Sequence, residues 1–352
     1  MQKTREVWID YTKMFACILV VLGHLLQGLN KANIDWNENL YSYINTFIYI
    51  FHMPLFMCLS GYLYKRYTKI KEWKEYAKFI KKKLINLGIP YVIFYLAYVL
   101  INMIFSSSVN SQKGIQDILN ILTNPMPPFW FLYALFFIFL IIPLLEKILK
   151  NNTNIVLGAS ILLYVISIYF NTNIYCIDIV AQYLVYFYIG AFLVDKLKEH
   201  YKNRNIIMLT ISFVVLSLLY CYIVKNNIIN GKITMLFKFL LAIMGIIVNI
   251  QIFKNLTNVI EKYKIFNLIS KNTFPIYLMH TTFSAGIRIV LLKLGINNFY
   301  IHFVLGLALG MLGPILVEKI LEKIKYGNVI LYPLKTLKEV RKENYENSND
   351  RA

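Results

Sequence analysis

The chain has 352 residues, of which 58% are hydrophobic and only 16% are charged. With a mean hydropathy of +0.55, this composition excludes an ordinary soluble domain and predicts an all-α integral membrane protein with many spans. The formal net charge is +19, but the Lys and Arg residues lie between apolar segments, as topology signals do, so the charge does not indicate nucleic-acid binding.

Ten apolar segments predict membrane-spanning helices, each of which needs about 20 mostly apolar residues. In chain order they are 8–29, 40–64, 84–105, 129–147, 155–171, 177–195, 206–225, 232–253, 273–292 and 299–319. The fifth segment is short, and the break NTNIYC that follows it could instead be a kink in a longer helix. No small-residue cleavage site follows the first segment, so we expect that segment to be retained rather than removed as a signal peptide.

The positive charges predict how these helices are oriented. Alternate connecting segments contain 29 Lys and Arg residues, and the remaining connections contain only 4. Because positively charged segments stay on the cytoplasmic side, both termini are expected there. We therefore predict one membrane domain over residues 1–325 and a polar cytoplasmic tail over 326–352.

The first span, WIDYTKMFACILVVLGHLL, contains three ionisable side chains, Asp10, Lys13 and His24. Lys13 and His24 are eleven positions apart, which places them on the same helix face, separated by about 16 Å along the axis. Asp10 lies three residues before Lys13 and could pair with it. Asp10 and Lys13 could alternatively extend to the membrane surface, but His24 is too deep to do so and indicates a functional site.

The second span contains FHMPLFMCLSGYLY. His52 lies near its middle, where a structural role is almost as well supported as a functional one. Pro54 leaves a backbone carbonyl without its helical donor and favours a kink. Ser60 is an alternative acyl carrier, although the Ser60-Gly61 pair also suits close helix packing.

Two further segments contain ionisable residues of interest. The third span is preceded by three consecutive lysines, Lys81, Lys82 and Lys83. These lysines either act only as orientation signals that attract anionic lipids, or they bind a phosphorylated ligand. The ninth span contains His280 and Arg288, and Arg288 could extend to the membrane surface.

The four cysteines, Cys17, Cys58, Cys176 and Cys221, show no metal-binding spacing, and we predict no metal site. A disulfide between Cys176 and Cys221 is conceivable, although all four residues also suit the role of small buried hydrophobes.

Four stretches together resemble the acyltransferase 3 family of integral membrane acyltransferases. In order they are IDYTKMFACILVVLGH, FHMPLFMCLSGYLY, the basic run before IPY followed by FWFLYALF, and FPIYLMH. The resemblance extends over about residues 8 to 320 and is strongest to the branch with fucose O-acetylase-like proteins. This chain has Lys13 where the family commonly has Arg, which weakens a role for a planar guanidinium there. It has Asn86 where the family often has a basic residue, which weakens a donor-binding role for the loop before IPY.

The resemblance implies O-acyl transfer, most commonly of acetyl from cytoplasmic acetyl-CoA, in the bacterial cytoplasmic membrane. The acceptor would be a hydroxyl of a surface polysaccharide, a cell-wall glycan or a lipid-linked sugar. We expect His24 to act as the base, with Lys13 and Asp10 beside it in the catalytic set, because histidine titrates near neutral pH. We expect the phosphates of the donor to be bound by Lys13, Lys81, Lys82 and Lys83. We expect the acceptor to be contacted by His52, Trp130, His280 and Arg288. The oxyanion would be stabilised by Arg288 or a backbone N–H.

Two other classes of function fit the same residues. A proton-coupled transporter or flippase would use His24, His52 and His280 as a proton relay. The absence of an internal repeat weighs mildly against that interpretation. A non-catalytic membrane subunit would use the polar residues only for packing.

Overall fold

The computed structural model describes residues 6–34, 36–107, 109–110, 112–196 and 203–340, and within residues 195–205 it describes no side chains. These ranges contain helices and no strand, which confirms the predicted all-α fold. The helices are α1 (Val7–Lys31), α2 (Glu38–Tyr67), α3 (Trp73–Lys83), α4 (Ile89–Ile104), α5 (Ile115–Leu119), α6 (Trp130–Ile148), α7 (Thr153–Tyr169), α8 (Tyr175–Lys196), α9 (Asn203–Lys225), α10 (Gly231–Ile260), α11 (Lys264–Lys271), α12 (Thr273–Lys293) and α13 (Phe299–Lys323).

Nine helices in the described part of the chain are long and apolar enough to cross a membrane. They coincide with nine of the ten predicted segments. The tenth, 155–171, forms α7, whose 17 residues extend about 25 Å and are therefore shorter than a typical apolar bilayer core. The break after α7 is a loop and not a kink, because Asn173 adopts a left-handed conformation there and Thr172 bonds to Asp178.

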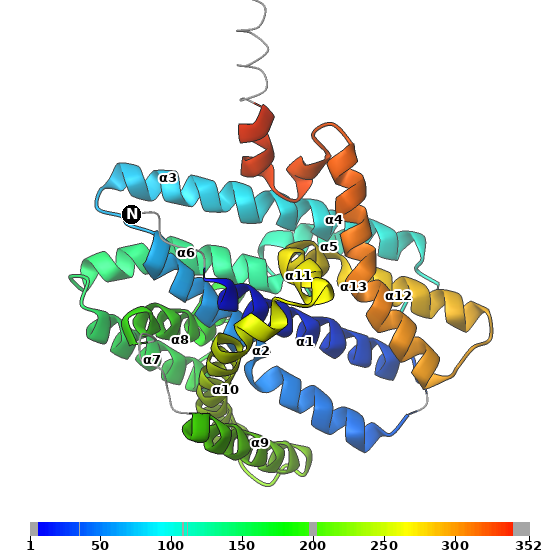
Figure 1. Ribbon diagram of the computed structural model, residues 1–352, viewed down its shortest axis with the longest axis horizontal. Helices are drawn as coiled ribbons and strands as arrows, with labels where there is room; N and C mark the ends of the chain where they lie inside the picture. Colours follow the sequence, from blue (N-terminus) through cyan, green and yellow to red (C-terminus); the bar gives the residue numbers. More distant parts are fainter. Residues whose placement is uncertain (1–5, 35, 108, 111, 197–202, 341–352) are drawn as a thin grey trace, which may run out of the picture.

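The third span begins earlier than its apolar segment. A π-helical turn, η1 (Leu84–Gly88), joins α3 to α4, so that one continuous helix extends over Trp73–Ile104 (Figure 1). Glu75 stabilises the start of α3 by accepting hydrogen bonds from the backbone N–H groups of Lys71 and Glu72. The polar residues 73–83, which precede the third predicted span, are therefore helical and extend the helix beyond its apolar part.

Helix α1 lies in the middle of the bundle, in contact with α2, α10, α12 and α13 (Figure 1). Its buried residues lie all around the helix, which explains why most positions of this segment are apolar. We call the end of the bundle where α1 begins the N-terminal face and the end where α1 finishes the distal face.

Helices α2 and α8 approach each other closely through two glycines. A Cβ atom on Gly61 would lie 1.7 Å from the carbonyl oxygen of Phe187, and one on Gly190 would lie 1.8 Å from that of Cys58. Ser60 donates its hydroxyl to the carbonyl of Phe56 in its own helix, at 2.8 Å. The SGY motif thus lies where helix packing demands a glycine.

The chain beyond α13 returns to the bundle. It forms the short 3-10 turn η3 (Gly327–Ile330), after which the Tyr332 hydroxyl donates to Glu318 at 2.8 Å and the Tyr332 ring lies beside Phe274. The end of the tail predicted over 326–352 lies outside the described residues from 341 onward. All four cysteines are free.

Candidate active site

Two histidines from different helices meet in the interior of the bundle. The rings of His24, on α1, and His280, on α12, have centroids 5.3 Å apart. His280 is fully buried, and its Nδ1 lies 2.9 Å from the carbonyl oxygen of Tyr277 and 3.0 Å from that of Ile276. Because carbonyl oxygens only accept hydrogen bonds, these contacts assign the proton to Nδ1 and leave the lone pair of Nε2 free to accept one. In the described structure, this Nε2 is buried without a hydrogen-bond partner.

His24 lies deep in the protein but remains partly exposed, whereas Gly23 and Leu25 on either side are buried. The ring of Tyr49 packs on Gly23, where an added Cβ would lie 3.1 Å from the ring edge. Tyr49 in turn meets His52 edge-to-face, with ring centroids 4.7 Å apart. His52 is buried and its Nδ1 lies 2.7 Å from the carbonyl of Ile48. Tyr49 therefore lies between His52 and the helix surface beside His24.

Trp130, at the start of α6, contacts Tyr183 of α8 with ring centroids 5.0 Å apart. The next residue, Phe131, lies 5.8 Å from the ring of Tyr277, and the Tyr277 hydroxyl donates to the carbonyl of Pro128. These contacts anchor the loop before α6 to α12, one turn before His280.

Three site aromatics were absent from the predicted set: Tyr49, Tyr183 and Tyr277. A signal for two of them is present in the sequence, because YIFH and YLMH both place a tyrosine three residues before a histidine. On a helix, that spacing puts the two side chains on the same face.

Arg288 follows His280 by about two turns of α12. It is only 7% exposed, so it does not extend to the membrane surface. Its Nη1 lies against Gly28 of α1, where an added Cβ would approach to 2.4 Å. Gly28 is one turn beyond His24, which places the guanidinium on the distal side of the two histidines.

The predicted donor-binding lysines separate into two groups. Lys83 turns inward, with its Nζ 3.7 Å from the centroid of the Phe139 ring, and its charge repels that of Lys13. Lys81 and Lys82 are exposed and belong to other faces of α3. The structure therefore brings Lys13 and Lys83 into one region, about 16 Å along α1 from His24.

Ion pairs surround the N-terminal face. Glu6 pairs with Arg66 at 2.6 Å and accepts a hydrogen bond from Tyr62 at 2.7 Å. On the other side of α2, Glu146 pairs with Lys65 at 2.9 Å and accepts from Tyr64 at 2.7 Å.

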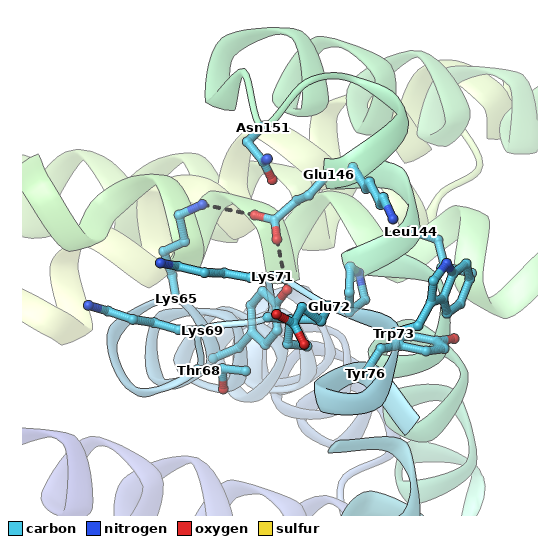
Figure 2. Close-up of a pocket in the computed structure, with 14 residues that line it drawn as sticks. Lys65, Thr68, Lys69, Lys71, Glu72, Trp73, Tyr76, Leu144, Glu146 and Asn151 are labelled. Carbon is cyan, nitrogen blue, oxygen red and sulfur yellow. Dashed lines mark hydrogen bonds and ion pairs between the residues drawn. The ribbon is translucent and has the colours of Figure 1, made fainter. Parts of the chain in front are cut away.

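A basic cavity of about 710 Å³ opens beside Glu146, between the end of α2, the start of α3 and the end of α6 (Figure 2). Its lining includes four lysines, two glutamates and three aromatic rings: Lys65, Lys69, Lys71, Lys147, Glu72, Glu146, Tyr64, Trp73 and Tyr76. Trp73 is 62% exposed, and Lys147 lies 5.2 Å from its ring. The sequence showed that the segment between α2 and α3 is basic. Only the fold shows that lysines from three segments line one cavity.

Comparison with known proteins now gives these residues a context. Residues 6–319 match the acyltransferase domain of the acyltransferase 3 family. The chain belongs to that family. The opening motifs of the sequence predicted this membership.

The chain is also similar to two curated relatives named nodulation protein NolL. It is 30% identical to the protein of Mesorhizobium japonicum over 160 residues, which cover 45% of this chain and 40% of that protein. It is 52% identical to the protein of Sinorhizobium fredii over 59 residues, which cover 17% of this chain and 16% of that protein. The matches thus span less than half the length of either relative. No solved structure matches the chain.

Proposed function

We propose that the protein moves an acetyl group from acetyl-CoA to a hydroxyl of a cell-surface polysaccharide, a cell-wall glycan or a lipid-linked sugar. The observation that carries this proposal is the facing pair of His24 and His280 in the bundle interior. Membership of the family supports acyl transfer over the transporter and the packing subunit.

His24 is the proposed general base, because it is the partly exposed member of the pair. It removes the proton from the acceptor hydroxyl while that oxygen attacks the thioester carbonyl. The tetrahedral intermediate then expels the thiolate of CoA, and His24 returns the proton to the sulfur. The free Nε2 lone pair of His280 accepts a hydrogen bond from the imidazolium that forms, which makes His280 a positioning residue.

Lys13 and Lys83 are the proposed contacts for donor phosphates. Their shared location between the N-terminal face and His24 supports that role. The basic cavity at the N-terminal face would attract the same polyanionic donor before it enters (Figure 2). We propose that this face is cytoplasmic, in accordance with the positive charges, and that the membrane is the bacterial cytoplasmic membrane.

The proposal is tested by transfer of label from radioactive acetyl-CoA into glycans or lipid-linked sugars, in membranes that contain equal amounts of wild type or His24→Ala. We expect the variant to lose at least about a hundredfold in rate, since a general base contributes that much or more. His302→Ala is the control, because His302 is an interior histidine of another helix, α13, and bonds to the carbonyl of Ile296 in the α12–α13 loop. Equal labelling by wild type and His24→Ala would exclude His24 as the base, and no labelling by wild type would contradict acetyl-CoA as the donor.

A further inference from the structure

Helix α12 contains an unusual number of buried polar atoms without partners. In the described part of the chain they are Nε2 of His280, Oγ1 of Thr281 and Nε of Arg288. Thr281 and Arg288 are seven residues apart and so lie on one stripe of the helix. Buried polar groups are almost always hydrogen-bonded, so several orphans on one helix indicate a binding face for a ligand.

Arg288 is the strongest of these cases, because a guanidinium is charged at any physiological pH. Burying a charge is costly unless an opposite charge or a set of acceptors compensates it. Arg288 is more than nine-tenths buried, and its Nε has no hydrogen-bond partner among the described residues.

No acidic side chain on the helices packed against α12 is placed to neutralise this charge. Helix α4 contains no acidic residue. On α1 the only one is Asp10, which is 18 residues, or about 27 Å, before Gly28. On α13, Glu318 bonds to Tyr332 at the opposite end of the bundle, and Glu322 lies a further turn along. The titratable side chain of α4 near Arg288 is Tyr98, and a phenol carries no charge at neutral pH.

We propose that Arg288 binds a permanently anionic oxygen group on the acceptor, a phosphate or a carboxylate, close to the hydroxyl that receives the acyl group. This inference rests on the proposed function. A planar guanidinium matches both groups because it can form two parallel hydrogen bonds with them. A transient oxyanion would neutralise the charge only during reaction, whereas an anion on the acceptor neutralises it throughout binding.

The position of Arg288 assigns the anion to the acceptor and not to the donor. Gly28, which the guanidinium touches, lies 15 residues, or about 22 Å, beyond Lys13, on the other side of His24. Asn110 reaches the same point, since its side-chain amide donates to the carbonyl of Gly28 at 2.8 Å. The anion site is therefore built from α1, α12 and Asn110 at the distal face.

The test measures binding without acetyl-CoA, so that it is independent of transfer. The full-length protein in nanodiscs is titrated with three probes that share one alkyl tail: decyl β-glucoside, decyl β-glucuronide and decyl phosphate. We expect wild type to bind at least one anionic probe about tenfold more tightly than the neutral glucoside, because hydrogen bonds between charged groups are strong. A preference for the glucuronide identifies an acidic sugar, and a preference for decyl phosphate identifies a lipid-linked or phosphorylated acceptor.

Two variants separate the effect of Arg288 from a loss of fold. Arg288→Gln removes the charge, and we expect it to bind all three probes equally. Gly28→Ala retains the charge but places a methyl group against Nη1, so it should weaken only the anionic probe. Gly286→Ala on the same helix is the matched control, because an added Cβ there meets no atom within 4 Å.

Equal binding of all probes by wild type, or an anionic preference that survives in Arg288→Gln, would overturn the inference. Failure of the proposed function is recognised separately, as wild-type membranes that transfer no label from acetyl-CoA while the anionic preference persists.

Discussion

At the scale of single residues, the proposed mechanism gives different roles to two histidines that have different surroundings. His280 has one nitrogen committed to backbone carbonyls of its own helix, and the resulting tautomer leaves its other nitrogen as an acceptor. His24 remains partly exposed, as the proposed base requires. The first is therefore suited to orient and stabilise, and the second to exchange protons.

This division predicts different outcomes for two substitutions of His280. His280→Asn keeps a donor near the position of Nδ1 but removes the acceptor at Nε2, so we expect the turnover number to fall roughly tenfold to a hundredfold, less than the loss of the base itself. His280→Gln keeps a polar group near Nε2 and should retain more of the rate. The KM for acetyl-CoA should stay within about twofold in both variants. Steady-state kinetics on purified protein measure these values, and equal turnover in the two variants would contradict the assigned role.

At the scale of helices, small residues determine how closely the elements that hold the site approach one another. Gly61 and Gly190 let α2 and α8 touch through their backbones. These helices contain His52 and Tyr183, so their separation sets the positions of those rings. Gly23 acts similarly on α1 by admitting Tyr49 beside His24.

We therefore expect Gly61→Ala to destabilise the protein although alanine is the better helix former. The added methyl would lie 1.7 Å from a backbone oxygen, so the two helices must separate, which costs about 1–3 kcal/mol or more. Gly158→Ala on α7 is the control, because its Cβ meets no atom within 4 Å and should be neutral or stabilising by up to about 1 kcal/mol. Thermal unfolding in detergent measures both, and an unchanged midpoint for Gly61→Ala would refute the close-packing argument.

At the scale of the whole molecule, the polar groups are arranged along α1 from one face to the other. Ion pairs and the basic cavity lie at the N-terminal face, Lys13 and Lys83 follow, the histidine pair comes next, and Arg288 lies beyond it. Under the proposed function, donor and acceptor would approach His24 from opposite directions.

The arrangement predicts that only one of the consecutive lysines matters for the donor. Lys83→Gln should raise the KM for acetyl-CoA by about tenfold, because Lys83 turns inward beside Lys13. Lys82→Gln, which removes an exposed lysine of the same helix, should change it less than twofold. Saturation curves for acetyl-CoA measure both values of KM. Equal effects of the two substitutions would contradict a special role for Lys83 and would indicate that the consecutive lysines act as one charged patch.

Nine of the ten predicted spans, the shared face of Lys13 and His24, and the family could be predicted from the sequence. These properties are local: hydropathy marks each helix, helical periodicity relates residues on it, and contiguous motifs identify the family. The extension of the third span to Trp73 was missed because its first turns are polar and owe their helical structure to capping.

Which helices are in contact is known from the tertiary structure and not from the sequence. In the structure, His24 lies beside His280, and Lys83 points away from its two neighbours. Lysines from different segments line one cavity, and Arg288 is buried without a carboxylate partner. Each of these facts joins residues far apart in sequence, and side-chain packing between helices sets them. Hydropathy constrains that packing weakly, because in a membrane every helix is apolar whichever neighbour it meets.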